Sequence, residues 1–296
     1  MGADRATLRL AGFAVGLVLA LGAGFLVGRA VGPVGSAPTA ASNPMGPGTA
    51  VDPNAHPHGG TAAVSTGSEV GGLSVAAGGY TLVPATTSFA AGATAPFRFH
   101  ITGSDRKPVT AFAIAHDKPM HLVVVRRDLT GYQHLHPTMA PEGTWSVDLR
   151  LAQPGIWRAY ADFATPGQGG ATTPVTLGVD LVAAGAYQPA ALPEPSRSAT
   201  VDGMTVTYEG TPNVGATQPL LFRVPATLEP YLGAYGHLVV LREGDCAYIH
   251  VHPENQLLGG AVKFWLSAPS SGRYRMFFDF QVAGKVHTAE YTLVVQ

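Results

Sequence analysis

Apolar and polar residues alternate in short runs from residue 73 to the end of the chain. The runs are rich in Val, Leu, Phe, Tyr and Thr, and Gly or Pro separates them at roughly the 8–12-residue spacing of sandwiches and barrels. In the first half, strands are expected at residues 80–85, 95–102, 109–115, 120–127, 132–137, 144–151, 155–163 and 173–182. In the second half, they are expected at 204–210, 218–224, 236–243, 247–253, 261–268, 272–280 and 285–296. We therefore predict an all-β protein with two tandem β-sandwiches, immunoglobulin-like or cupredoxin-like in strand order.

A different pattern precedes the strands. Leu10–Gly28 is an uncharged run of 19 residues, close to the length that spans a bilayer, with Arg5 and Arg9 before it. Arginines on this side place the N-terminus in the cytoplasm. We predict one transmembrane helix within residues 1–30. The alternative is a cleaved signal peptide with a processing region at residues 37–42. Both readings place the remainder outside the cytoplasm, membrane-anchored or secreted.

Composition divides the rest of the chain into four parts. Residues 31–72 are rich in Gly, Pro, Ala, Ser and Thr, which predicts a disordered tether. The first sandwich is expected at 73–183 and the second at 200–296. Residues 184–199 lack periodicity and predict a linker.

The charge balance argues against a nucleic-acid partner. Charged residues make up 12% of the chain, the formal net charge is −1, and there is no basic run. Cys246 is the single cysteine, so an intrachain disulfide is impossible. The fold must therefore rest on its apolar cores or on a bound metal.

One sequence motif occurs twice. "HLVVVRRDLTGYQHLHP" occupies residues 121–137 and "HLVVLREGDCAYIHVHP" occupies residues 237–253. Each copy is followed by a strand-like segment that begins Gly-x-aromatic-Arg and ends in Asp-Phe, "GIWRAYADF" and "GRYRMFFDF". Duplication of one domain explains this agreement.

The motif predicts histidines gathered on one face of a hairpin. If the first copy turns at Asp128-Leu129, His121 lies opposite His136, and His134 shares a face with His136 because strand side chains alternate. Three imidazoles of this kind suit zinc, copper or nickel. The alternative is a hydrogen-bonded polar cluster without metal. The candidate metal ligands are His121, His134, His136, His237, His250 and His252.

Other residues near the motif are candidates for the same site. Asp162 and Asp279 recur at equivalent places and could accept a hydrogen bond from a ligating imidazole, or simply cap a turn. His116 could be a fourth ligand of the first site. Cys246 is about 13 Å along an extended strand from His250, which argues against a blue-copper site.

The sequence resembles a known family through "DKPMHLVVVRRDLTGYQHLHP" and "PYLGAYGHLVVLREGDCAYIHVHPE". Similar segments occur in exported, membrane-anchored or secreted bacterial β-sandwich proteins described as heavy-metal-binding, which look like relatives of the cupredoxin-like and YtkA-like domains. The resemblance implies an extracytoplasmic β-sandwich with a role toward copper or another transition metal.

These observations predict a membrane-anchored module that binds copper or zinc, handles the metal and passes it to a protein partner. The alternative is a structural or protein-interaction ectodomain without metal. We do not expect an enzyme, because the sequence contains no HExxH pair, nucleophile elbow or phosphate loop.

Overall fold

The structure is a computed structural model that describes residues 70–167, 170–249 and 251–296, without the side chain of His252. In these residues it is all-β and contains no α-helix, which confirms the predicted class. The predicted membrane segment and nearly all of the predicted tether lie outside the described residues. Within the described part, no helix is long and apolar enough to cross a membrane.

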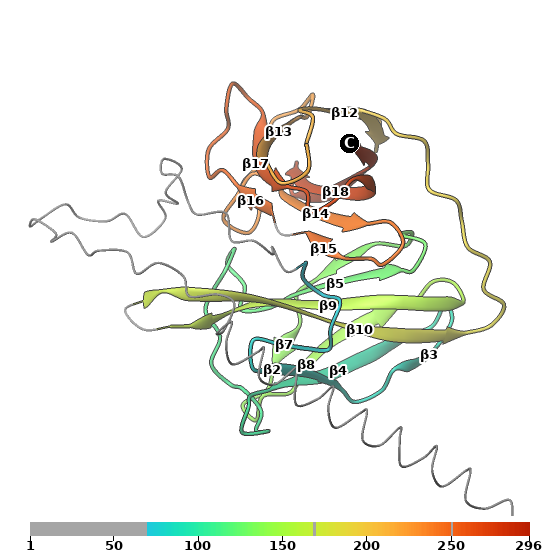
Figure 1. The fold of residues 1–296 in the computed structure, drawn as a ribbon, viewed down its shortest axis with the longest axis vertical. Helices are drawn as coiled ribbons and strands as arrows, with labels where there is room; N and C mark the ends of the chain where they lie inside the picture. The colour runs from blue at the N-terminus through green and yellow to red at the C-terminus, as the bar shows by residue number, and fades with distance from the viewer. Residues whose placement is uncertain (1–69, 168–169, 250) are drawn as a thin grey trace, which may run out of the picture. The chain divides into compact units, whose positions relative to one another are not determined.

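The first sandwich consists of two sheets packed face to face (Figure 1). One sheet has the order β1 (Ala76–Ala77), β2 (Tyr80–Pro84), β4 (Thr94–Thr102), β8 (Trp145–Arg150) and β7 (Thr138–Met139). The other has the order β3 (Ser88–Ala90), β10 (Thr172–Ala184), β9 (Gly155–Pro166), β5 (His121–Arg126) and β6 (Gln133–Leu135). Alternate residues of β4 point inward, and Phe97 and Phe99 join Trp145 and Trp157 in a fully buried core.

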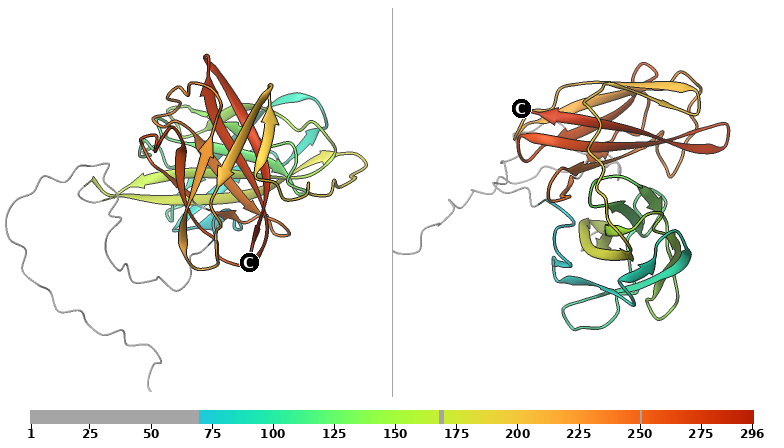
Figure 2. Two further views of the ribbon diagram at one scale, coloured as in Figure 1. Left: turned by 90° about the horizontal axis from the view of Figure 1, so that it is seen from above. Right: turned by 90° about the vertical axis from the view of Figure 1, so that its right-hand side faces the viewer.

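The second sandwich repeats this plan, and Figure 2 shows its strands in two layers. One sheet has the order β11 (Ser198–Val201), β12 (Met204–Glu209), β13 (Thr217–Arg223), β17 (Val262–Ser267) and β16 (Val251–Pro253). The other has the order β15 (Tyr248–Ile249), β14 (His237–Arg242), β18 (Gly272–Val282) and β19 (Lys285–Val295). Its core contains a group of packed aromatic rings, Phe222, Phe264 and Phe278. Residues 185–197, between β10 and β11, carry no strand.

The repeat extends to pairing register. His121 of β5 pairs with Asp162 of β9, and His237 of β14 pairs with Asp279 of β18. The first histidine of each motif is therefore paired with the aspartate of the Asp-Phe pair in the strand that follows. This agreement is what duplication of one domain predicts.

Two predicted strands differ from the structure. The predicted strand 247–253 is divided between β15 and β16, which belong to different sheets. Residues 109–115 form a loop that touches the sheets through single bridges, such as Ala113 with Ala164. The chain then makes a tight turn, Ala115–Lys118, in which His116 and Asp117 both have positive φ. Such a turn suits a two-residue hairpin and ends any continuous strand. The short strands β1, β3, β7 and β11 were not predicted, because two to four residues give too little pattern.

The central strands β5 and β14 are buried on both faces. All six residues of β5 and five of the six in β14 are buried. One face of each strand fills its own core, and the other belongs to an apolar cluster shared by both sandwiches. That cluster contains Val123, Val125, Leu129, Tyr160, Val239, Leu241, Cys246, Tyr248 and Phe277. Burial on both faces explains why these strands read as continuous apolar runs rather than alternating ones.

Residues 71–74 join the two sandwiches through backbone hydrogen bonds. Gly71 and Tyr248 exchange two bonds of 3.0 Å, which attaches the segment to β15. The Gly72 N–H donates to the Thr176 carbonyl at 3.0 Å, and the Gly178 N–H donates to the Ser74 carbonyl at 2.8 Å, which attaches it to β10. We call residues 71–74 the strap.

Gly72 is required where the strap crosses Tyr160. Its φ is +70°, and an added Cβ would lie 2.3 Å from the Tyr160 ring. We predict that Gly72→Ala lowers the free energy of unfolding by about 3 kcal/mol or more, measured by urea unfolding, because strain and a steric clash add. Gly79→Ala is the matched control, since Gly79 has φ +83° and open space around it. Its loss should be near 1 kcal/mol, and equal losses would contradict the steric argument.

Candidate metal centre

Three of the predicted ligands meet at the open end of the β5–β6 hairpin. Leu122 pairs with Leu135 and Val123 with His134, the register that places His121 across from His136. One ring nitrogen from each of His121, His134 and His136 lies within 4.8 Å of the other two. The three histidines of the first motif therefore gather on one face of the hairpin, as the sequence predicted.

His121 is fixed by the turn that precedes its strand. Its Nε2 lies 3.0 Å from the Ala115 carbonyl oxygen, which can only accept a hydrogen bond. His121 must therefore donate through Nε2 and keep a lone pair on Nδ1 when the ring is neutral. The positive-φ residues His116 and Asp117 bring this carbonyl back over the strand.

His134 is fixed by the second sandwich. Its Nδ1 lies 2.9 Å from Oδ2 of Asp279, in β18. Tyr132 donates its hydroxyl to the same oxygen at 2.8 Å, and Thr288 donates to Oδ1 at 2.6 Å. An ionised carboxylate only accepts, so His134 donates through Nδ1 and a neutral ring keeps its lone pair on Nε2.

The two lone pairs face each other. His121 Nδ1 and His134 Nε2 are 3.1 Å apart. Two neutral acceptors at this distance repel, so either a proton or a metal cation must lie between them. His136 adds a third nitrogen, because its Nε2 is buried and has no hydrogen-bond partner among the described residues.

Burial keeps several of these rings uncharged. It lowers the pKa of His121 to about 4, with the neighbouring His134 adding to the effect. It lowers the pKa of His136 to about 3, and again His134 contributes. Neutral imidazole is the form that binds a metal ion, so these rings need not lose a proton near pH 7.

His237 lies beside this cluster although it belongs to the other copy of the motif. Its ring centroid is 6.1 Å from that of His134 and 6.3 Å from that of His121. Its Nε2 bonds the Tyr231 carbonyl at 2.9 Å, and burial lowers its pKa to about 3. His116 is 5.2 Å from His237 between ring centroids. Residues of both sandwiches therefore surround the cluster.

Two of the three ligands predicted for the second set fall outside the described part of the chain. His250 and the side chain of His252 lie outside the described residues. Cys246 is buried beside the Arg127 carbonyl, in the apolar cluster between the sandwiches.

Sequence reasoning identified the three histidines but not what orients them. Asp279 was a candidate acceptor for a ligating imidazole, and its carboxylate accepts a hydrogen bond from His134 of the other copy. Tyr132 was not considered. An aromatic residue at the same place in both motifs, Tyr132 and Tyr248, was the available signal.

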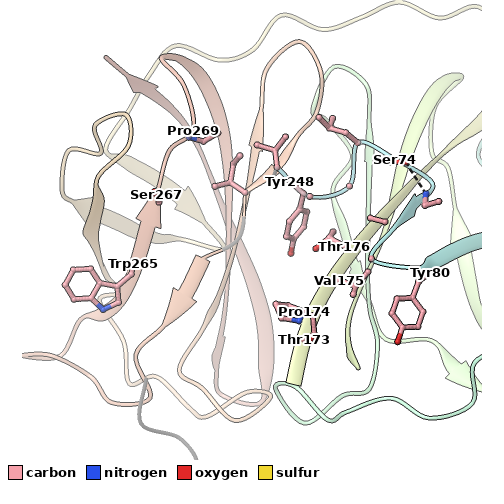
Figure 3. A pocket seen from close by; sticks show the side chains of 18 of the residues that line it. Ser74, Tyr80, Thr173, Pro174, Val175, Thr176, Tyr248, Trp265, Ser267 and Pro269 are labelled. Atoms are coloured by element: carbon pink, nitrogen blue, oxygen red, sulfur yellow. Dashed lines mark hydrogen bonds between the residues drawn. The ribbon is translucent and has the colours of Figure 1, made fainter. Parts of the chain in front are cut away.

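A separate pocket of about 900 Å³ lies beside the strap (Figure 3). Its lining includes Thr176, Tyr248 and Trp265, and none of the three clustered histidines. It is therefore distinct from the candidate centre.

Comparisons with known proteins give a family. The family model described as "Domain of unknown function (DUF8832)" matches residues 75–180 and 199–296. No curated protein matches this chain.

Similar solved structures are remote. An alpha-2-macroglobulin mutant from Salmonella is 13% identical over 77% of this chain, with a TM-score of 0.27. The Yersinia pseudotuberculosis adhesin InvE is 14% identical over 73%, with a TM-score of 0.21, and the Escherichia coli adhesin FdeC is 16% identical over 73%, with a TM-score of 0.24. This chain spans 15%, 58% and 64% of those three chains, respectively. None of them supports a functional inference.

The buried histidines predict that acid destabilises the metal-free protein. Unfolded histidines titrate near pH 6.5, whereas burial lowers the pKa to about 4 in His121 and about 3 in His136 and His237. Below pH 6.5 the unfolded state therefore binds more protons, and stability falls as the pH falls toward these folded values. Between pH 7 and pH 5 we expect a loss of about 2 kcal/mol or more in urea unfolding with chelator present.

A variant checks the origin of this acid sensitivity. His136→Ala removes one depressed pKa and should make the loss between pH 7 and pH 5 smaller. A loss as large as that of the wild-type protein would show that other groups cause it.

Proposed function

The chain belongs to the DUF8832 family, and from the geometry of its histidines we propose that it binds a transition metal ion, copper or zinc, outside the cytoplasm. The first site uses His121, His134 and His136 as ligands. The protein holds or hands over the ion rather than catalysing a reaction, and a metal-handling protein is the partner that such transfer needs. The N-terminal apolar segment anchors it to the membrane.

One observation carries the metal proposal. His121 Nδ1 and His134 Nε2 present lone pairs to each other at 3.1 Å, and each ring is held in that orientation from its far side. Metal–imidazole bonds are about 2.0–2.1 Å long, so an ion between these two nitrogens requires only a small opening. His136 supplies a third nitrogen with no competing partner among the described residues.

The donor set favours particular ions. Imidazole nitrogens suit zinc, copper and nickel, whereas calcium and magnesium prefer oxygen ligands. Three histidines also leave a coordination position open, which suits an ion that is passed on. In the described part of the chain, no thiol belongs to the cluster.

We also propose that each sandwich is immunoglobulin-like. In the first, β2, β4, β8 and β7 correspond to an A-B-E-D sheet, and β10, β9, β5 and β6 to a G-F-C-C′ sheet. The parallel pairing of β3 with β10 supports an A strand divided between the two sheets.

The test is metal binding by the full chain, purified without a polyhistidine tag. We expect tight binding of Zn²⁺ or Cu²⁺ in competition with a chelator. His136→Ala should weaken the first site at least about 10-fold, a loss typical for an altered metal site, without breaking any hydrogen bond among the described residues. His100→Ala, a change in β4 outside the cluster, is the control and should bind like the wild type.

Two outcomes would contradict the proposal. The wild-type protein could lack tight binding of either ion, which would favour a structural or adhesive ectodomain with a hydrogen-bonded histidine cluster. Alternatively, His136→Ala could bind as tightly as the wild type. The predicted second set, His237, His250 and His252, is tested separately by changing all three and counting the equivalents of metal lost.

A further inference from the structure

Asp279 reaches the histidine cluster from the opposite sandwich. It lies in β18, in register with His237, and only 2% of its surface is exposed. A buried carboxylate is costly unless its oxygens accept hydrogen bonds. Here Thr288 of β19 holds Oδ1, while Tyr132 and His134 of the first sandwich donate to Oδ2. The carboxylate therefore belongs to the second sandwich and accepts hydrogen bonds from two side chains of the first.

This bond decides which nitrogen of His134 faces the cluster. With Nδ1 turned to Asp279, Nε2 lies 3.1 Å from His121 Nδ1. A flip of the ring would turn carbon atoms toward both partners. Since the bond also makes His134 donate through Nδ1, it keeps the lone pair on the inward nitrogen of the neutral ring.

The neighbouring contacts make this arrangement depend on docking of the two sandwiches. Tyr132 stacks on Phe277 with ring centroids 4.1 Å apart and planes 4° from parallel. Val123 and Val239 pack in the same apolar cluster. Phe277 is two residues from Asp279 on β18, so the stack and the carboxylate are placed by one strand.

We propose that Asp279 is a positioning residue supplied by the second sandwich to a metal centre whose three ligands all come from the first. The inference rests on the proposed function, because it assigns a role at the same centre. It follows that the first site is complete only when the sandwiches are docked, and that a bound ion stabilises the docked pair by linkage. The two sandwiches then build one metal site together and are not independent metal-binding domains.

The test compares variants of the full chain. Zn²⁺ affinity is measured by chelator competition, and Co²⁺ is used as a spectroscopic probe of ligand geometry. Asp279→Leu removes both acceptor oxygens, and we expect about 100-fold weaker binding. Asp279→Asn keeps one acceptor but loses the charge, and we expect about 10-fold weaker binding and an altered Co²⁺ spectrum. Both values lie in the range for lost partners of metal-binding histidines.

Val125→Ala is the matched control. It removes apolar atoms from the cluster shared by the two sandwiches, four residues along β5 from His121, and leaves the hydrogen bonds to Asp279 in place. The melting temperature should fall, while the Zn²⁺ affinity stays within about twofold of the wild type, because distant sites without shared partners act independently. A purely structural role for Asp279 would make all three variants lose stability without a specific change in affinity or spectrum.

The outcomes separate this inference from the proposed function. If Asp279→Asn binds Zn²⁺ like the wild type while His136→Ala does not, the positioning role is overturned and the metal site stands. This comparison remains decisive if Asp279→Leu fails to fold. If the wild-type chain does not bind Zn²⁺ or Cu²⁺, the proposed function and this inference fail together.

Discussion

The packing of β5 and β14 across the boundary between the sandwiches is the contact on which the rest of the structure depends. Both strands are central in their sheets and buried on both faces, so each belongs to two cores. Solvent exposure of the shared face would uncover Val123, Val125, Val239 and Leu241 together. The hydrophobic effect therefore holds the two sandwiches in contact. The hydrogen bonds from Tyr132 and His134 to Asp279 lie next to that contact, since Asp279 is two residues from Phe277 of the shared cluster.

The contacts around this boundary occur in related pairs, one from each copy of the motif. His121 bonds the Ala115 carbonyl and His237 bonds the Tyr231 carbonyl, each six residues earlier in the chain. Tyr132 stacks on Phe277, and Tyr248 lies 5.4 Å from Tyr160 between ring centroids. Duplicated domains that pack through the same face produce such pairs of equivalent contacts. The turns before the motifs share a positive-φ backbone but differ in side chains, since His116 and Asp117 in the first copy correspond to Leu232 and Gly233 in the second.

The sequence predicted local geometry better than contacts between the sandwiches. The spacing of His121, His134 and His136 predicts their shared face because hairpin register and strand alternation are local rules. Strand runs such as 155–163 and 272–280 were found for the same reason, although β9 and β18 extend beyond them. The bond from His134 to Asp279 spans 145 residues and depends on how two domains dock, which no local pattern encodes. Residues 71 and 72 of the strap were assigned to a disordered tether because the composition there is that of a linker, whereas backbone hydrogen bonds to β10 and β15 fix residues 71–74.

The strap has a mechanical consequence. The chain enters the two sandwiches between β10 and β15, and its hydrogen bonds are divided between Thr176 and Gly178 on one side and Tyr248 on the other. A pulling force applied before Val70 would thus be shared by both sandwiches instead of loading the first and reaching the second through residues 185–197. The segment could leave only after its bonds to both sandwiches had broken, so the strap resists extraction as a joint attachment of the two domains.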